Sequence, residues 1–168
     1  MSHRQLALVL AALVILLDQA SKWLIVAVVM QPPRIIEVTG FFNLVLTYNR
    51  GVSFGLGAGV SVWILVGLSL VIVAGLLVWL SRQDRALVAY AIGLVVGGAL
   101  GNVIDRLHAP GVIDFLDFHA FGWQPHWPAF NLADSAIAVG VALLIFDGLF
   151  LERSEGRTEG LGGNGGTE

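Results

Sequence analysis

Four long apolar runs dominate the sequence, and each is long enough to form a helix that crosses a membrane. Such a helix needs about 20 predominantly apolar residues. Runs of this kind occupy residues 6–29, 60–80, 86–106 and 131–151. The first run continues past Asp18 and Lys22 and ends at Pro32-Pro33, which makes it longer than the core of a cleaved signal peptide. We expect it to stay in the mature protein, and the pattern predicts an all-α polytopic membrane protein with four transmembrane helices.

The composition agrees with this fold class and excludes several classes of function. Of the 168 residues, 57% are apolar and 12% are charged, whereas soluble domains carry about 25% charged residues. The formal net charge of -3 excludes the basic surface typical of nucleic-acid binding. The absence of cysteine excludes disulfides, thiolate zinc sites and thiol nucleophiles.

The distribution of basic residues predicts the orientation of the four helices. Short cytoplasmic loops are enriched in lysine and arginine. When the spans alternate, one side of the membrane carries Arg4, Arg82, Arg85, Arg153 and Arg157. Both termini are therefore expected in the cytoplasm. We assign residues 1–153 to a single domain and expect the polar, Gly-rich tail at 154–168 to be a disordered cytoplasmic segment.

The two segments on the outer side are longer than simple connections. Ile35–Phe54 holds β-branched and aromatic residues interrupted by glycine, which predicts a small sheet at the membrane surface. Leu107–Ala129 combines phenylalanine, tryptophan and proline, a composition typical of the aromatic belt of membrane proteins. We expect this second segment to lie along the bilayer surface.

Ionisable residues from four distant segments are predicted to meet at one depth, in the outer half of the membrane. They are Asp18, Lys22, Asp105, Arg106, Asp114 and Asp134. Charged groups within a membrane are energetically costly and commonly functional. The shared depth favours a functional site, and a polar seam that holds the helices together is the alternative.

Several polar and glycine positions also have purely structural interpretations. Asp18 and Lys22 are spaced i,i+4, which suits an ion pair within one helix. Overlapping GxxxG units, typical of close helix packing, are formed by Gly93, Gly97 and Gly101. The histidines lack the spacing of a metal site, and we predict no metal and no cofactor. No catalytic role is assigned to His108, His119, His126, Asp117 or Asp147.

Two carboxyl groups held close together can hydrolyse a peptide bond without a metal ion. When they share a site, the pKa of one rises, so that it holds a proton while the other stays ionised. The ionised group can take a proton from water, and the protonated group can later protonate the leaving amine. Asp114 and Asp134 fit this pattern, and spacing alone leaves Asp105 as an equal candidate for the first carboxyl group.

Five sequence blocks, taken in order, resemble the lipoprotein signal peptidases, also called signal peptidase II. The blocks are DQASK at 18–22, NRGVSF at 49–54, GGALGNVIDR at 97–106, VIDF at 112–115 and FNLADS at 130–135. The resemblance covers roughly residues 6–151. One departure is Val52-Ser53, where family members more often carry pairs of small alanine residues.

The resemblance implies a fold, a reaction and a set of site residues. The implied fold has four membrane helices, a small periplasmic β-cradle and an interfacial half-helix. The implied reaction is that of an aspartic endopeptidase, which removes the signal peptide from diacylglyceryl-modified prolipoproteins just before the lipidated cysteine. The catalytic pair falls on Asp114 and Asp134. Supporting or substrate-binding roles fall on Asn49, Gly51, Asn102, Asp105, Arg106 and Asn131, with Asp18 and Lys22 bracing the site.

The resemblance also implies where and with what the protein works. It implies the bacterial cytoplasmic (inner) membrane, an active site at the outer leaflet in contact with membrane lipid, and inhibition by globomycin-type peptides. We expect a monomer. On the residues alone, one alternative is a four-span proton-coupled exporter in which Asp18, Asp105 or Asp134 carries protons, and another is a non-catalytic membrane scaffold.

Overall fold

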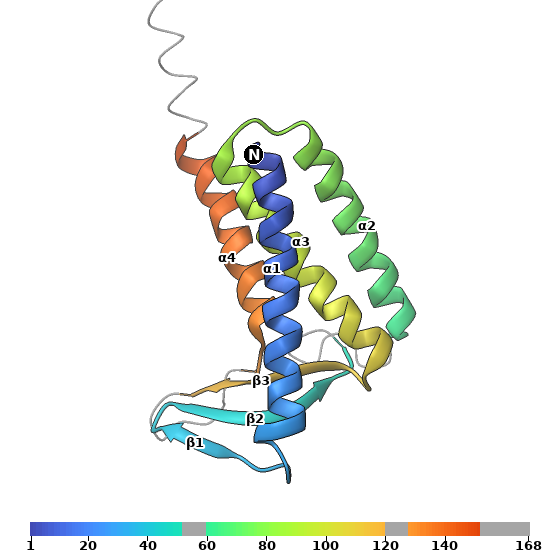
Figure 1. The fold of residues 1–168 in the computed structure, drawn as a ribbon, viewed down its shortest axis with the longest axis vertical. Coiled ribbons are helices and arrows are strands. Elements are labelled where there is room, and N and C mark those ends of the chain that lie inside the picture. The colour runs from blue at the N-terminus through green and yellow to red at the C-terminus, as the bar shows by residue number, and fades with distance from the viewer. Residues whose placement is uncertain (52–59, 120–127, 152–168) are drawn as a thin grey trace, which may run out of the picture.

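Four long helices and a small sheet make up the fold (Figure 1). The computed structural model describes residues 1–51, 60–119 and 128–151. The helices are α1 (His3–Leu24), α2 (Val62–Ser81), α3 (Ala86–His108) and α4 (Leu132–Phe146), and π-helical turns at Ile25–Val29 and Asp147–Leu151 extend α1 and α4. All four are long and apolar enough to cross a membrane, which confirms the predicted spans.

Helix α3 lies at the centre of the bundle and is the most buried of the four. One of its faces packs on α1 and α2 through a core that includes Ala7, Val73, Ala89, Ile92 and Val96. The other helices expose large apolar side chains along most of their length. Because such a surface is unfavourable in water, it is the part of the protein that membrane lipid covers.

Glycines on α3 allow its neighbours to approach closely. A Cβ atom added at Gly93 would lie 2.5 Å from the carbonyl oxygen of Ala7, and one at Gly97 would lie 2.7 Å from that of Ala11. These contacts confirm the predicted packing role of the GxxxG pattern. At Gly101 the added atom would lie 2.7 Å from Asp18 Oδ2, so this glycine makes room for a carboxylate.

The close approach of α1 and α3 predicts different effects for two mid-helix glycines. We expect Gly93→Ala to lower the free energy of unfolding by about 1–3 kcal/mol, since the new methyl group meets backbone that must shift. At Gly75 on α2 no described atom lies within 4 Å of an added Cβ, so Gly75→Ala is the matched control and should not destabilise the protein. Thermal unfolding in detergent measures both, and equal effects would contradict the packing role.

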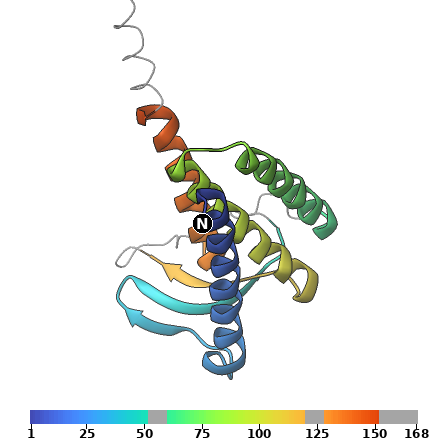
Figure 2. The same ribbon diagram turned by 45° about the horizontal axis from the view of Figure 1, so that its top comes forward.

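The sheet lies at the end of the bundle opposite the N-terminus, as Figures 1 and 2 show. It is antiparallel with the order β1-β2-β3, formed by Ile36–Thr39, Phe42–Asn49 and Val112–Phe118. Two of its strands come from the predicted segment, but the third comes from the segment expected only to lie along the bilayer. A bulge between Leu44 and Thr47 shifts the register of β2 against β3.

The sheet is fixed to the end of the first span by an apolar cluster. Phe115 of β3 packs with Ile25 and Met30, which follow α1 in the chain. This cluster places β3 directly beneath the helical bundle. The interfacial half-helix is not among the elements of residues 1–51, 60–119 and 128–151, and the expectations for Val52-Ser53 and for the tail at 154–168 also lie outside the described residues.

Candidate functional site

Strand β3 and the start of α4 bring the two predicted catalytic aspartates together. Asp114 lies in the middle of β3, and Asp134 lies in the first turn of α4. The backbone joins the two elements, because the N–H groups of Phe115 and Leu116 donate to the carbonyl oxygen of Phe130. The chain then enters α4 two residues later, at Leu132. We refer to Asp114 and Asp134 as the dyad.

Asn131 connects the two carboxyl groups of the dyad. It is fully buried and caps α4, accepting a hydrogen bond from the backbone N–H of Asp134 at 2.9 Å. Its Nδ2 donates to Asp114 Oδ1 at 2.7 Å, and its backbone N–H donates to Asp134 Oδ2 at 3.4 Å. Asn131 thus starts the helix with its side chain and, with its side chain and backbone together, links the Asp134 carboxylate to the strand.

The surroundings of Asp114 favour its protonated form. Burial raises the pKa of Asp114 to about 7, and the nearby negative charge of Asp134 acts in the same direction. Hydrogen bonds from Asn49 and Asn131 oppose this rise, since they stabilise the ionised carboxylate. Asp134 Oδ1 accepts an equally short hydrogen bond of 2.7 Å from Asn102 Nδ2, but the Asp134 side chain is only half-buried. The two carboxyl groups therefore have unequal environments.

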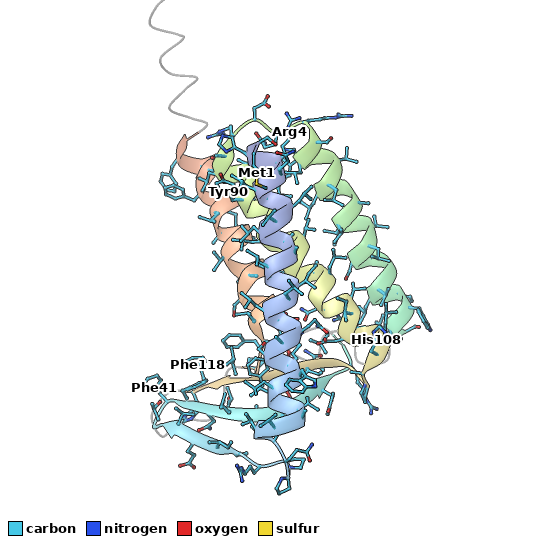
Figure 3. All side chains as sticks on the ribbon, viewed as in Figure 1. Met1, Arg4, Phe41, Tyr90, His108 and Phe118 are labelled. Carbon is cyan, nitrogen blue, oxygen red and sulfur yellow. The ribbon has the colours of Figure 1, made fainter. Side chains whose placement is uncertain are left out.

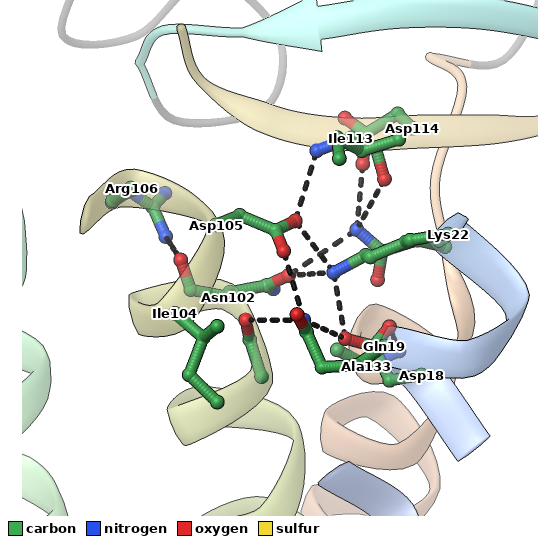
Figure 4. A network of polar contacts seen from close by, with 12 residues as sticks. Asp18, Gln19, Lys22, Asn102, Ile104, Asp105, Arg106, Ile113, Asp114 and Ala133 are labelled. Atoms are coloured by element: carbon green, nitrogen blue, oxygen red, sulfur yellow. Dashed lines mark hydrogen bonds and ion pairs between the residues drawn. The ribbon is translucent and has the colours of Figure 1, made fainter. Parts of the chain in front are cut away.

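The buried ammonium group of Lys22 lies below Asp114 in the view of Figure 4. Lys22 Nζ lies 2.7 Å from Asp18 Oδ2 and 2.7 Å from Asp105 Oδ2, and all three side chains are almost completely buried. It also donates to Asn102 Oδ1 at 3.2 Å. The structure therefore contains the ion pair within α1 that the spacing predicted, and adds a second carboxylate from α3.

The carboxylates of this cluster hold the two elements that carry the dyad. Asp18 Oδ1 accepts from the backbone N–H of Ala133 at 3.0 Å, next to Asp134. Asp105 Oδ2 accepts from the backbone N–H of Ile113 at 3.0 Å, next to Asp114. Both oxygens of Asp105 have partners, because Gln19 Nε2 donates to Oδ1 at 2.9 Å. This arrangement makes Asp105 a support and favours Asp114 as the first carboxyl group of the dyad.

The remaining candidates line the open side of the site. Asn49 Nδ2 donates to Asp114 Oδ2 at 3.2 Å, and Asn49 Oδ1 accepts from the N–H of Gly51. Arg106 donates to the carbonyl oxygens of Asn102 and Gly51 at 3.2 and 3.3 Å. Its guanidinium group therefore joins the end of α3 to the residues that follow β2.

Other polar residues lie away from the dyad. Asp117 Oδ2 accepts from Asn43 Nδ2 at 3.1 Å, and Asp147 forms an ion pair with Arg85 at the far end of the bundle. His108 contacts the carbonyl oxygen of Ile104, and His126 lies outside the described residues. Within the described ranges, no group of three or more histidine, aspartate or glutamate side chains could hold a metal ion.

Three contributors to the site were not selected from the sequence. Gln19 donates to Asp18, Asp105 and the carbonyl oxygen of Gly101 from a single Nε2 atom. The sequence did offer a signal for Gln19, because its amide side chain lies next to the charged residues of an apolar run. The backbone N–H groups of Ile113 and Ala133 carried no such signal, because only the tertiary fold brings a carboxylate to them.

Comparisons with known proteins identify the family to which this arrangement belongs. The sequence model described as Signal peptidase (SPase) II matches residues 10–150. The chain belongs to the signal peptidase II family. It is 49% identical over 144 residues to the lipoprotein signal peptidase of Azoarcus sp. (strain BH72), which covers 83% of this chain and 80% of that protein.

Other relatives and a solved structure agree with this assignment. The lipoprotein signal peptidase of Rhizorhabdus wittichii is 42% identical over 153 residues, with coverage of 89% of this chain and 88% of that protein. A solved structure described as a bacterial membrane enzyme has a TM-score of 0.76 at 28% identity and covers 98% of this chain and 95% of that one. Family and spans together make this chain a multi-pass peptidase of the bacterial inner membrane.

The buried position of Lys22 predicts a large cost when its charge is removed. We expect Lys22→Met to lower the free energy of unfolding by about 3–5 kcal/mol, because two buried carboxylates lose their shared cation. The matched control is Arg4→Met, whose ion pair with Asp84 has side chains 41% and 91% exposed and should contribute about 1 kcal/mol or less. Denaturant titration in mixed micelles measures the difference, and similar losses for both variants would contradict this ranking.

Proposed function

We propose that this chain is an aspartic endopeptidase that removes the signal peptide from diacylglyceryl-modified prolipoproteins, cleaving just before the lipidated cysteine. The observation that carries the proposal is the linkage of Asp114 and Asp134 through Asn131. It joins the buried Asp114 to the half-buried Asp134, two carboxyl groups with unequal environments, and acid–base hydrolysis of an amide requires such a pair. The names of the relatives support the lipoprotein substrate.

The hydrogen bonds of the dyad suggest a distinct role for each aspartate. Asp134 takes the role of the base, at the start of α4, where Asn102 Nδ2 and the Asn131 N–H hold its two oxygens in place. Asp114 is the acid, because its raised pKa of about 7 keeps a substantial protonated fraction near neutral pH. This assignment concerns the resting enzyme, since the proton is redistributed during the reaction.

The proposed reaction proceeds through one tetrahedral intermediate. Asp134 takes a proton from water while the water oxygen bonds to the scissile carbonyl carbon, and Asp114 gives its proton to the carbonyl oxygen. Asp134 then gives the proton it gained to the amide nitrogen, and the C–N bond breaks. Asp114 recovers its proton from the hydroxyl group as the carboxylic acid product forms. The dyad returns to its starting state with one water consumed.

The position of the dyad suits a substrate that is anchored in the membrane. Asp114 and Asp134 lie where the ends of the spanning helices meet the sheet, so lipid chains can approach from the bilayer while the scissile bond meets polar side chains. Asn49 donates to Asp114, and Arg106 donates to the nearby Gly51 carbonyl oxygen, so we assign both residues to contacts with the substrate backbone. We place this end at the outer leaflet, with both termini in the cytoplasm, and we propose a monomer in which residues 1–153 act as one domain.

The exporter and scaffold alternatives lose support from the family and from the arrangement of the carboxyl groups. An exporter needs protonatable groups accessible from both faces. Here Asp18 and Asp105 are held in ion pairs with Lys22 beside the dyad, all at one end of the bundle. The chain also belongs to a peptidase family. These observations favour hydrolysis over transport.

The dyad predicts loss of turnover when either carboxyl group becomes an amide. We expect Asp114→Asn and Asp134→Asn each to reduce cleavage of a diacylglyceryl prolipoprotein by about 10²- to 10⁴-fold, because proton transfer to or from the reacting groups is lost. A gel-shift assay measures this cleavage, and retained binding of a globomycin-type inhibitor shows that the variants are folded. Asp117→Asn on the same strand is the control and should retain cleavage, since Asp117 faces Asn43. Normal turnover by either dyad variant would refute the assignment.

The raised pKa of Asp114 predicts a decline in activity above neutral pH. The ratio kcat/KM should fall as pH rises through about 7, because the acid then loses its proton. The hydrogen bond from Asn49 lowers this pKa, so Asn49→Ala should move the decline to higher pH. Asn43→Ala is the control and should leave the profile unchanged, since Asn43 contacts Asp117. A shift to lower pH in Asn49→Ala would contradict the proposed role of Asp114.

A further inference from the structure

A second polar site lies at the end of the bundle opposite the dyad. A cavity of about 310 Å³ opens between the last turn of α2, the start of α3 and the end of α4, and its lining includes Trp79, Arg85, Leu144 and Asp147. Asp134 and Asp147 lie on one continuous helical segment, 13 residues apart, which corresponds to about 20 Å. The cavity is therefore separate from the dyad and its substrate. We call it the Arg85–Asp147 cavity.

The two charged groups of this cavity leave hydrogen-bonding capacity unused. Arg85 lies 2.8 Å from Asp147 Oδ1, with side chains 32% and 7% exposed. The ion pair covers Asp147 Oδ1 without the alignment of a hydrogen bond, and no described residue donates a hydrogen bond to Asp147 Oδ2. A guanidinium group carries five N–H donors, and this ion pair engages one of its terminal nitrogens. The cavity thus presents a carboxylate with an unused acceptor beside a partly exposed cation.

The location of the cavity matches that of a lipid headgroup. Figure 3 places Arg4 and Tyr90 at this end of the bundle, opposite His108 and Phe118. Trp79 is 44% exposed, as is typical of aromatic side chains at the membrane surface. The volume lies at the lower end of the range of about 300–1,000 Å³ found for small-molecule sites.

We propose that the Arg85–Asp147 cavity binds the headgroup of a zwitterionic phospholipid with a primary ammonium group, such as a phosphoethanolamine lipid. Arg85 donates to the phosphate, and the Asp147 carboxylate accepts from the ammonium group through Oδ2. Trp79 and Leu144 border the path of the acyl chains. An anionic lipid has no donor cation for Asp147, and a quaternary ammonium headgroup has no N–H to donate. The pair of opposite charges therefore selects the primary amine.

The proposal is tested by measuring which lipid the purified full chain retains. Native mass spectrometry compares dioleoyl lipids with ethanolamine, choline and glycerol headgroups at equal concentration. We expect retention of the ethanolamine lipid to exceed that of the other two by about tenfold, the effect of one charge-assisted hydrogen bond. Arg85→Gln and Asp147→Asn should each remove this preference. Arg82→Gln on the same exposed loop is the matched control and should retain it.

A third variant tests the cavity without altering its charges. Gly148 also lines the cavity, and an added Cβ there meets no described atom within 4 Å, so Gly148→Leu is chosen to occupy the space. It should abolish the preference for ethanolamine while leaving prolipoprotein cleavage in detergent unchanged. Because both charges remain, this result stays decisive even when a charge variant fails to fold. Equal retention of the three lipids, preference for the glycerol headgroup, or unaltered selectivity in Gly148→Leu would each overturn the proposal.

Discussion

The buried ammonium group of Lys22 is the interaction on which the geometry of the site depends. Removing a charged amine from water is costly, and the cost is offset only when carboxylates and hydrogen bonds surround it. Here Asp18 of α1 and Asp105 of α3 lie at equal distances from Nζ. Each carboxylate then holds a backbone N–H beside one member of the dyad. The position of one cation therefore fixes the relative position of α1, α3, β3 and the start of α4.

The network also explains why the two aspartates of the dyad differ. Two carboxylates, Asp18 and Asp105, share the single charge of Lys22, so the cluster supplies no net positive charge to the dyad. Asp134 lies half-buried at the start of α4 and accepts from Asn102 Nδ2 and the Asn131 N–H, whereas Asp114 lies buried on β3 and accepts from the side-chain amides of Asn49 and Asn131. The asymmetry arises from the elements that carry the residues. A helix start favours an anion, and a buried strand favours a neutral acid.

The sequence predicted the four spans and the clustering of ionisable residues from distant segments, because both follow from local patterns. Run length predicts a spanning helix, and the recurrence of ionisable residues at equivalent ends of four segments predicts a cluster. The sequence could not show that β3 leaves its own segment to pair with β2. Nor could it show that Asn131 connects Asp114 to Asp134. The Asn131 cap of α4 depends on local spacing, but the hydrogen bond from Asn131 to Asp114 depends on the tertiary fold. Features set by the local sequence could therefore be predicted, and tertiary contacts such as the pairing of β2 with β3 could not.

The small residues of α3 and the charges of the site form one continuous feature. Gly93, Gly97, Gly101 and Asp105 recur every four residues, so they follow one face of the helix toward the sheet. The glycines face Ala7, Ala11 and Asp18 of α1 in the same order. Because no Cβ separates the backbones along this face, α1 and α3 lie close enough for Lys22 to reach Asp105 at 2.7 Å. The packing of the apolar half of the bundle thus determines the electrostatics at its polar end.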